Sequence, residues 1–178
     1  MKIVLNIGHG GKDQGAETLD HKLTELRFNQ TILGPAIVEE LLNLDHEVIS
    51  FSQKEAFWEV AKKCNELNPD IVLSLHSNCF NGKASGTETL YYAKSTRSKR
   101  LATCLQQRIV NTLWLPDRGL RPLYKGDRGF NLVYYTKMPA VILEPFFIDN
   151  PNDLVVVQSK VKQLALAISL GVTDYQHG

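Results

Sequence analysis

The 178-residue sequence predicts a single α/β domain with a twisted, mostly parallel β-sheet and helices on both faces. The first observation is that short runs rich in β-branched and aromatic residues alternate with longer amphipathic segments. The second is that several short runs are apolar at almost every position, as expected for strands covered on both faces. The third is the length, which fits one domain able to bury a core without disulfides.

Five short segments are predicted strands. They are Lys2–Ile7, Glu47–Phe51, Asp70–Leu75, Thr87–Tyr92 and Ala140–Leu143. The first, third and fifth are close to continuously apolar, so we expect them at the centre of the sheet. In open α/β sheets, ligands bind beyond the carboxyl ends of the strands. The residues that directly follow these three strands are therefore the first candidates for a functional site.

The longer segments are predicted helices. In Leu23–Leu44, apolar residues recur at spacings of three, four or seven, which is helical spacing. Gly34-Pro35 lies inside this segment and predicts a kink or a split into two helices, because proline cannot donate a backbone hydrogen bond. Further helices are predicted over Ala56–Leu67, Lys99–Leu115 and Leu154–Leu170, and Thr173–Gly178 is predicted to be a short tail.

The composition excludes several classes of protein. A net charge of +1 gives no basic excess of the kind that nucleic-acid binders carry. The three cysteines are unclustered, which argues against a disulfide framework and a thiolate metal site. The apolar start of the chain is too short and interrupted for a signal-peptide core, and no stretch is long enough to span a membrane. We expect a monomer made in the cytoplasm without a signal peptide, with no nucleic-acid partner and no membrane insertion.

Three predicted strands end on a chemically reactive side chain. His9 follows the first, His76 follows the third and Glu144 follows the last. Because the carboxyl ends of parallel strands meet at one edge of a sheet, we expect these side chains to lie close together. Two histidines can supply two of the three protein ligands of a catalytic zinc ion, whose fourth position is left for water. Glu144 sits at the rim of the core, where an unpaired charge is costly, so it should be paired or catalytic.

The third ligand is less certain from the residues alone. Glu25 lies near the start of the first predicted helix, and the loop after His9 could fold it over the strand ends. Glu17 in the same loop is the competing ligand, and Asp13 and His21 are weaker ones. An acidic residue in the first turn of a helix is also favourable without any ligand, so the pattern by itself does not decide.

Several motifs in this order are similar to those of a known family. They are Ile7–Gly11 (IGHGG), Glu25 at a helix start, Asp70–Asn78 (DIVLSLHSN), Arg118–Arg121 (RGLR), and Pro139–Glu144 (PAVILE) followed by Phe147 and Asn150. With them the chain resembles the zinc-dependent N-acetylmuramoyl-L-alanine amidases, a family that includes bacterial cell-wall amidases and phage endolysins. The resemblance runs over nearly the whole chain.

The resemblance implies a role for each matching residue. Zn²⁺ would be held by His9, Glu25 and His76, and Glu144 would be the catalytic base. Asn78 and Arg121 would bind substrate. The implied reaction is hydrolysis of the amide that joins N-acetylmuramic acid to L-alanine in peptidoglycan. Where the family often has glycine, this chain has Phe146, which predicts a narrower substrate groove.

We expect residues 1–178 to form an amidase catalytic domain without a separate cell-wall-binding domain. The favoured biological role is a phage endolysin that acts on the cell wall after release. The alternatives are a bacterial sporulation or cell-separation amidase, a non-catalytic wall-binding module, and a metal-free glycosidase that uses Glu25 and Glu144 as a carboxylate pair.

Overall fold

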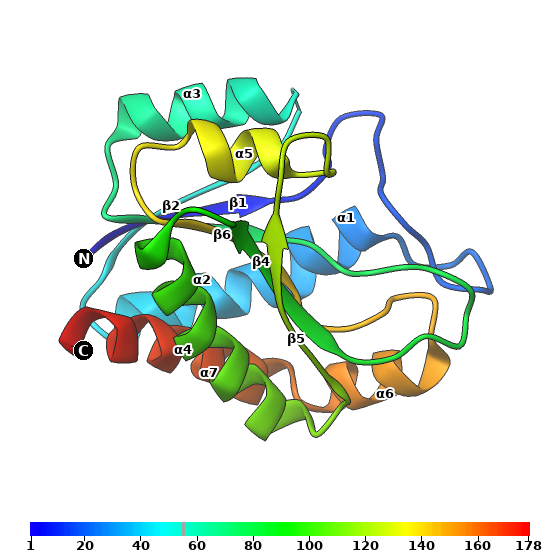
Figure 1. Cartoon of the computed structure of the whole chain (residues 1–178). Helices are drawn as coiled ribbons and strands as arrows, with labels where there is room; N and C mark the ends of the chain where they lie inside the picture. The colour runs from blue at the N-terminus through cyan, green and yellow to red at the C-terminus, as the bar shows by residue number, and fades with distance from the viewer. Residues whose placement is uncertain (55) are drawn as a thin grey trace.

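The computed structural model describes residues 1–54 and 56–178. Its centre is a six-stranded sheet with the strand order β2-β1-β3-β6-β4-β5 (Figure 1). The strands are β1 (Lys2–Ile7), β2 (Glu47–Ser52), β3 (Ile71–Leu75), β4 (Thr87–Tyr92), β5 (Asp117–Leu123) and β6 (Ala140–Glu144). Four of the five neighbouring pairings are parallel, and only β4 and β6 pair antiparallel. The predicted α/β class with a mostly parallel sheet is confirmed.

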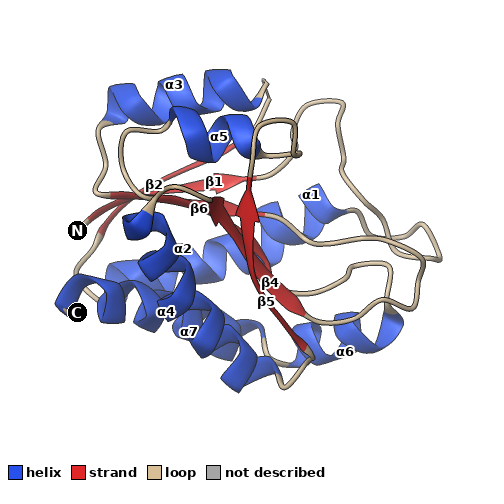
Figure 2. Cartoon of the chain, in the orientation of Figure 1, coloured by secondary structure: helices blue, strands red, loops and turns tan. Residues whose placement is uncertain are grey.

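Helices cover both faces of the sheet. The helical elements are α1 (Glu25–Phe28), the π-helical η1 (Asn29–Leu33), α2 (Gly34–Asn43), α3 (Phe57–Leu67), α4 (Thr96–Leu113), α5 (Phe130–Tyr135), α6 (Pro151–Ser159) and α7 (Val161–His177). Helices α2, α4 and α7 pack together on one face. Helices α3 and α5 lie side by side on the other (Figure 2).

Alternation along the central strands divides the core between these two layers, because successive strand residues point to opposite faces. Ile3 and Leu5 belong to the apolar cluster beneath α2, α4 and α7. Val4, between them, belongs to the cluster beneath α3 and α5, together with Val72 of β3. All of these side chains are fully buried, which explains why β1 and β3 are apolar at nearly every position.

The first long helix is not split at Gly34-Pro35. Instead α1, η1 and α2 follow one another without a break from Glu25 to Asn43, and the π-helical turn lies immediately before the glycine and proline. A π-turn changes the spacing of the backbone hydrogen bonds. Such turns are frequent where a side chain disturbs the regular backbone hydrogen bonds of an α-helix.

The C-terminal helices also differ from the prediction. The segment predicted as one helix forms α6 and α7, which meet at an angle of 79°. The predicted tail is wrong as well, because α7 continues to His177 and buries Tyr175 against the core. In the described parts of the chain no single helix is long and apolar enough to cross a membrane. Helices α6 and α7 taken together would be long and apolar enough, by length and composition only, but they form a bent pair.

Candidate metal centre

The strand register brings the predicted site residues to one edge of the sheet. Ile7 of β1 pairs with Leu75 of β3, and Leu75 pairs with Leu143 of β6. The backbone nitrogen of His76 then donates to the carbonyl of Leu143 over 2.9 Å. Residues that follow these strand ends, among them His76 and Glu144, are therefore neighbours because of backbone pairing alone.

His9 follows β1 after a single glycine. Its backbone has a φ of +64°, a left-handed conformation that residues other than glycine seldom adopt and that is often found at functional sites. This turn aims the imidazole toward His76, and the two ring centroids lie 5.2 Å apart. A Cβ atom on Gly8 would lie 2.3 Å from Cε1 of His76, so only glycine allows the two histidines to approach in this way.

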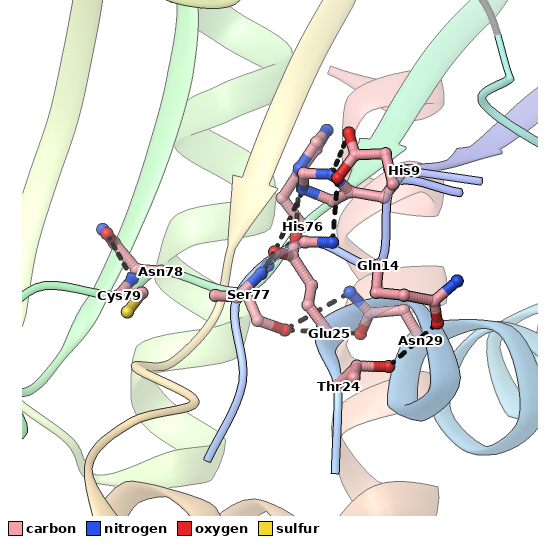
Figure 3. Close-up of polar contacts among 12 residues, drawn as sticks. His9, Gln14, Thr24, Glu25, Asn29, His76, Ser77, Asn78 and Cys79 are labelled. Carbon is pink, nitrogen blue, oxygen red and sulfur yellow. Dashed lines mark hydrogen bonds and ion pairs between the residues drawn. The ribbon is translucent and has the colours of Figure 1, made fainter. Parts of the chain in front are cut away.

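Glu25 comes from the other side of the site, as the first residue of α1. The Thr24 side chain caps this helix by accepting a hydrogen bond from the backbone nitrogen of Arg27 at 3.2 Å. The Glu25 carboxylate is buried between the two histidines (Figure 3). Its Oε2 lies 3.1 Å from Nε2 of His9, and its Oε1 lies 3.1 Å from Nδ1 of His76.

The surrounding loops hold this carboxylate in place. The backbone nitrogen of Ser77 donates to Oε1 of Glu25 at 2.9 Å, and that of Ala16 donates to Oε2 at 3.2 Å. The side chains of Asn29 and Ser77 hydrogen-bond each other in the buried space next to it. Glu25 is thus fixed by four directional contacts and has little freedom to leave the two histidines.

The His–Glu–His cluster (His9, Glu25 and His76) has the donors of a metal site. One nitrogen or oxygen from each residue lies within 4.8 Å of the others, and all three residues are buried. The two 3.1 Å contacts are close to the roughly 3.4 Å that separates ligands around a tetrahedral ion with bonds of about 2.1 Å. Nδ1 of His9 is held by Asp13 at 2.8 Å, the kind of second contact that orients metal-binding histidines.

The electrostatics of the cluster favour a bound cation. Burial alone would raise the pKa of Glu25, but hydrogen bonds and charges from His76 and His9 hold it far below its usual value. Burial alone would lower the pKa of His9, yet Glu25 and Asp13 raise it. The carboxylate is therefore ionised at any physiological pH, and it attracts either a proton on His9 or a metal ion between the ligands.

Glu144 lies at the end of β6 in the same pocket, which has a volume of about 600 Å³. Its Oε2 atom is buried and has no hydrogen-bond partner within the described residues. Burial raises the pKa of this carboxyl well above its usual value, and the charges of Glu25 and Glu88 raise it further. Arg128 and Arg121 act in the opposite direction. A carboxyl whose pKa is raised in this way can hold a proton more readily than an ordinary glutamate, which suits general acid–base catalysis.

Of the competing residues, Asp13 contacts the far nitrogen of His9, whereas Glu17 and His21 lie elsewhere. Glu17 is hydrogen-bonded to His21 over 2.7 Å on the exposed part of the loop, away from the His–Glu–His cluster. The structure therefore brings Glu25, and not Glu17, between the histidines. The predicted groove-narrowing role of Phe146 is wrong, because this ring is fully buried and packs edge-on against Phe28 in the core.

The two predicted substrate-binding residues both line the pocket. The amide of Asn78 is already engaged within the protein: its Nδ2 donates to Glu88 at 2.7 Å, and its Oδ1 accepts from the backbone nitrogen of Cys79 at 2.9 Å. Arg121 belongs to β5, which β6 and β4 separate in the sheet from the strands that precede the two histidines.

Among the residues of this pocket that sequence reasoning missed are Gly15, Glu88 and Arg128. Glu88 carried a signal, because it is the one charged residue in the strand sequence TETLYY. Gly15 and Arg128 lie in loops, where neither periodicity nor strand ends point to a function.

This arrangement of histidines and carboxylates, at the strand ends of an α/β sheet, defines the class of metal-dependent hydrolases. The family follows from sequence comparison. A profile of the N-acetylmuramoyl-L-alanine amidase family matches residues 3–174, and the chain belongs to that family.

Similar proteins come from several bacteria. The chain is 28% identical over 180 residues to the uncharacterized protein YqiI of Bacillus subtilis, covering 97% of this chain and 84% of YqiI. It is 30% identical to the N-acetylmuramoyl-L-alanine amidase LytC of Bacillus subtilis, over 97% of this chain and 35% of LytC. It is 28% identical to the probable cell wall amidase LytH of Staphylococcus saprophyticus, over 89% of this chain and 52% of LytH. The chain thus spans about a third of the length of LytC and about half of the length of LytH.

Solved structures agree with the fold. An N-acetylmuramoyl-L-alanine amidase from Clostridium difficile 630 superposes with a TM-score of 0.84 at 27% identity, over 98% of this chain and 96% of that chain. The catalytic domain of the endolysin CD27L superposes with the same TM-score at 24% identity, over 98% and 97% of the two chains, and shows the shared fold.

Proposed function

We propose that this chain is a zinc-dependent amidase that hydrolyses the bond between N-acetylmuramic acid and L-alanine in peptidoglycan. The observation that carries the proposal is the buried His–Glu–His cluster in one pocket with Glu144. The family and the named relatives supply the substrate class. The donor set of two imidazoles and one carboxylate supports zinc, because catalytic zinc sites commonly have three such ligands.

A bound zinc ion would polarise the scissile carbonyl and lower the pKa of the attacking water. Glu144 would take the proton from that water on its unpartnered Oε2 atom and deliver it to the leaving nitrogen. Burial and the neighbouring carboxylates, which raise the pKa of Glu144, would help this side chain to hold the proton between the two steps.

The alternative chemistries fit the geometry less well. A glycosidase with Glu25 and Glu144 as its carboxylate pair would leave His9 and His76 without a role, and Glu25 is enclosed by those histidines instead of facing open substrate space. A non-catalytic wall-binding module would have no need for the unpartnered carboxyl of Glu144.

For the biological role, we propose action on the cell wall after the chain leaves the cytoplasm, as a phage endolysin. The shared fold with the CD27L endolysin catalytic domain supports this role. Sporulation or cell separation would use the same chemistry. The roles can be distinguished by adding the protein to intact cells and to purified walls: an endolysin should lyse intact cells from outside, whereas an enzyme of the other two roles should act on purified walls only.

The monomeric state stays a prediction, which size-exclusion chromatography with light scattering can test.

The first experiment combines metal analysis with product analysis. Purified protein reconstituted with zinc should hold one ion per chain and release new L-alanine amino termini from purified walls. New reducing ends without new amino termini would overturn the amidase assignment. Less than stoichiometric metal after reconstitution would count against the metal site.

Variants then separate metal binding from chemistry. His9→Ala and Glu25→Ala should lose both the metal and the activity. Glu144→Gln should keep the metal and lose activity by roughly 10²–10⁴-fold, the usual contribution of a positioned acid–base group. Glu17→Ala is the matched control, because Glu17 is an exposed glutamate of the same region and should keep both properties.

A further inference from the structure

One wall of the pocket is a single face of the strands β6, β4 and β5. Residues that pair directly across neighbouring strands point to the same face. Glu88 of β4 pairs with Glu144 of β6, and two residues later Leu90 pairs with Ile142. Leu90 also pairs with Arg121 of β5, which places that arginine on the same face as the catalytic carboxyl. All five of these side chains line the pocket.

The arginines in and beside the pocket differ in their contacts. Arg118 forms a salt bridge to Glu88 at 3.1 Å, so its charge is neutralised within the protein. Arg121 and Arg128 line the pocket, and neither takes part in an ion pair within residues 1–54 and 56–178. They are exposed to solvent at the pocket surface and free to receive an anion.

Arg128 reaches the pocket from a loop and not from the sheet. It belongs to the loop that joins β5 to α5, next to Gly129 of the pocket wall (Figure 1). Its positive charge lowers the pKa of Asp13, in the loop after β1, and also acts on Glu144. Arg121 acts on Glu144 as well. Both arginines line the pocket that holds Glu144, so a substrate bound there for hydrolysis would come within reach of their charge.

We propose that Arg121 and Arg128 form a subsite for a carboxylate of the substrate, namely the first free carboxylate of the stem peptide beyond the alanine. The inference rests on the proposed function. The sugar side of the scissile bond has no free carboxylate, because the muramic acid carboxyl is part of the amide. Negative charge lies on the peptide side, and guanidinium groups bind carboxylates through two parallel, charge-assisted hydrogen bonds.

The charge balance of the pocket explains why such a subsite is needed. Glu25 and Glu144 line the pocket and, when ionised, would repel an anionic peptide, whereas Glu88 is paired with Arg118. Arg121 of β5 and Arg128 of the following loop, both without an ion pair within the described residues, offset that repulsion and select the orientation in which the peptide points toward β5. The subsite would therefore set both the preferred stem peptide and the direction in which the glycan strand leaves the pocket.

The test uses two soluble muramyl-peptide substrates that differ only in having a free carboxylate or a carboxamide on the residue after the alanine. The zinc-loaded parent should prefer the carboxylate in kcat/KM, and Arg128→Gln and Arg121→Gln should each reduce that preference by about tenfold. Most of the loss should be in KM, because the contact is made in the bound ground state as well. Lys125→Gln is the matched control: it removes an exposed positive charge from the same loop outside the pocket, and should keep the preference.

A second readout separates binding from turnover. Glu144→Gln protein loaded with zinc should bind the carboxylate peptide more tightly than the carboxamide in calorimetry, and adding Arg128→Gln should remove the difference. A parent that cleaves neither substrate would overturn the proposed function and the subsite with it. A parent that cleaves both substrates equally well, with the same ratio in Arg128→Gln, would overturn the subsite alone.

Discussion

Replacing Gly15 with alanine should damage the metal site without unfolding the protein. Gly15 has a φ of +70°, and a Cβ atom there would lie 2.6 Å from Oε2 of Glu25 and 2.7 Å from Cδ2 of His9. Ordinary contacts begin at 3.4 Å, so Glu25 would have to move by 3.4 − 2.6 = 0.8 Å. Metal–ligand distances in well-formed sites vary by only about 0.2 Å. The displaced carboxylate could no longer hold the metal as in the parent protein.

The matched control is Gly11→Ala. Gly11 lies in the same loop with a φ of +61°, and a Cβ atom there would have no neighbour within 4 Å. Both variants force alanine into a left-handed conformation, which costs about 1–2 kcal/mol of stability. Only Gly15→Ala disturbs Glu25 and His9, and changes to groups that orient metal ligands typically lower metal affinity by about 10–100-fold.

The assay is a zinc titration in competition with a chromophoric chelator, together with thermal melts of the metal-free proteins. We expect similar melting temperatures for the two variants and a loss of affinity in Gly15→Ala alone. Equal zinc affinities for Gly15→Ala and Gly11→Ala would refute the argument, because the close approach of Gly15 to the ligands would then have no consequence.

Three further predictions follow from the site and the core. Asp13→Asn should lower zinc affinity by about 10–100-fold, measured by the same competition, because Asp13 orients His9 through its Nδ1 atom. Zinc occupancy, measured by metal analysis after dialysis, should fall as the pH drops through the pKa of His9. Because Glu25 and Asp13 raise this pKa, protons should begin to compete with zinc for His9 above pH 6.5, the approximate pKa of an unperturbed histidine. Phe146→Ala should lower the free energy of unfolding in urea by about 3–5 kcal/mol and leave the preference between substrates unchanged, since this ring is in the core.

Sequence patterns predicted the central strands because burial dictates their composition. β1, β3 and β6 are covered on both faces, so nearly every position must be apolar and the runs stand out. β5 is an edge strand, and its sequence DRGLRPL contains charges, glycine and proline that edges tolerate. α5 spans only six residues, too few to show a helical period. These two elements were missed because their sequences carry no periodic signal.

The metal ligands were only partly predictable. His9 and His76 follow the ends of two central strands, and the sheet topology alone brings them together. The position of Glu25 depends on the path of the loop over residues 8–24, which is set by left-handed residues such as His9 and Gly15 and by single backbone hydrogen bonds. No spacing rule specifies such a path, so Glu25 and Glu17 could be distinguished only by resemblance to a family and then by the structure.

The antiparallel pairing of β4 with β6 explains which half of the pocket could be predicted. In a wholly parallel sheet, every residue at the functional edge would follow a strand end. Because β4 and β5 run in the opposite direction, their first residues lie beside the last residue of β6, and Glu88 pairs with Glu144. The strand ends supply the histidines and Glu144, whereas Glu88 lies near the start of β4 and Arg121 lies within β5. The metal-binding half and the charged recognition half of the pocket thus come from strands of opposite direction, and only the first follows the usual rule for α/β sheets.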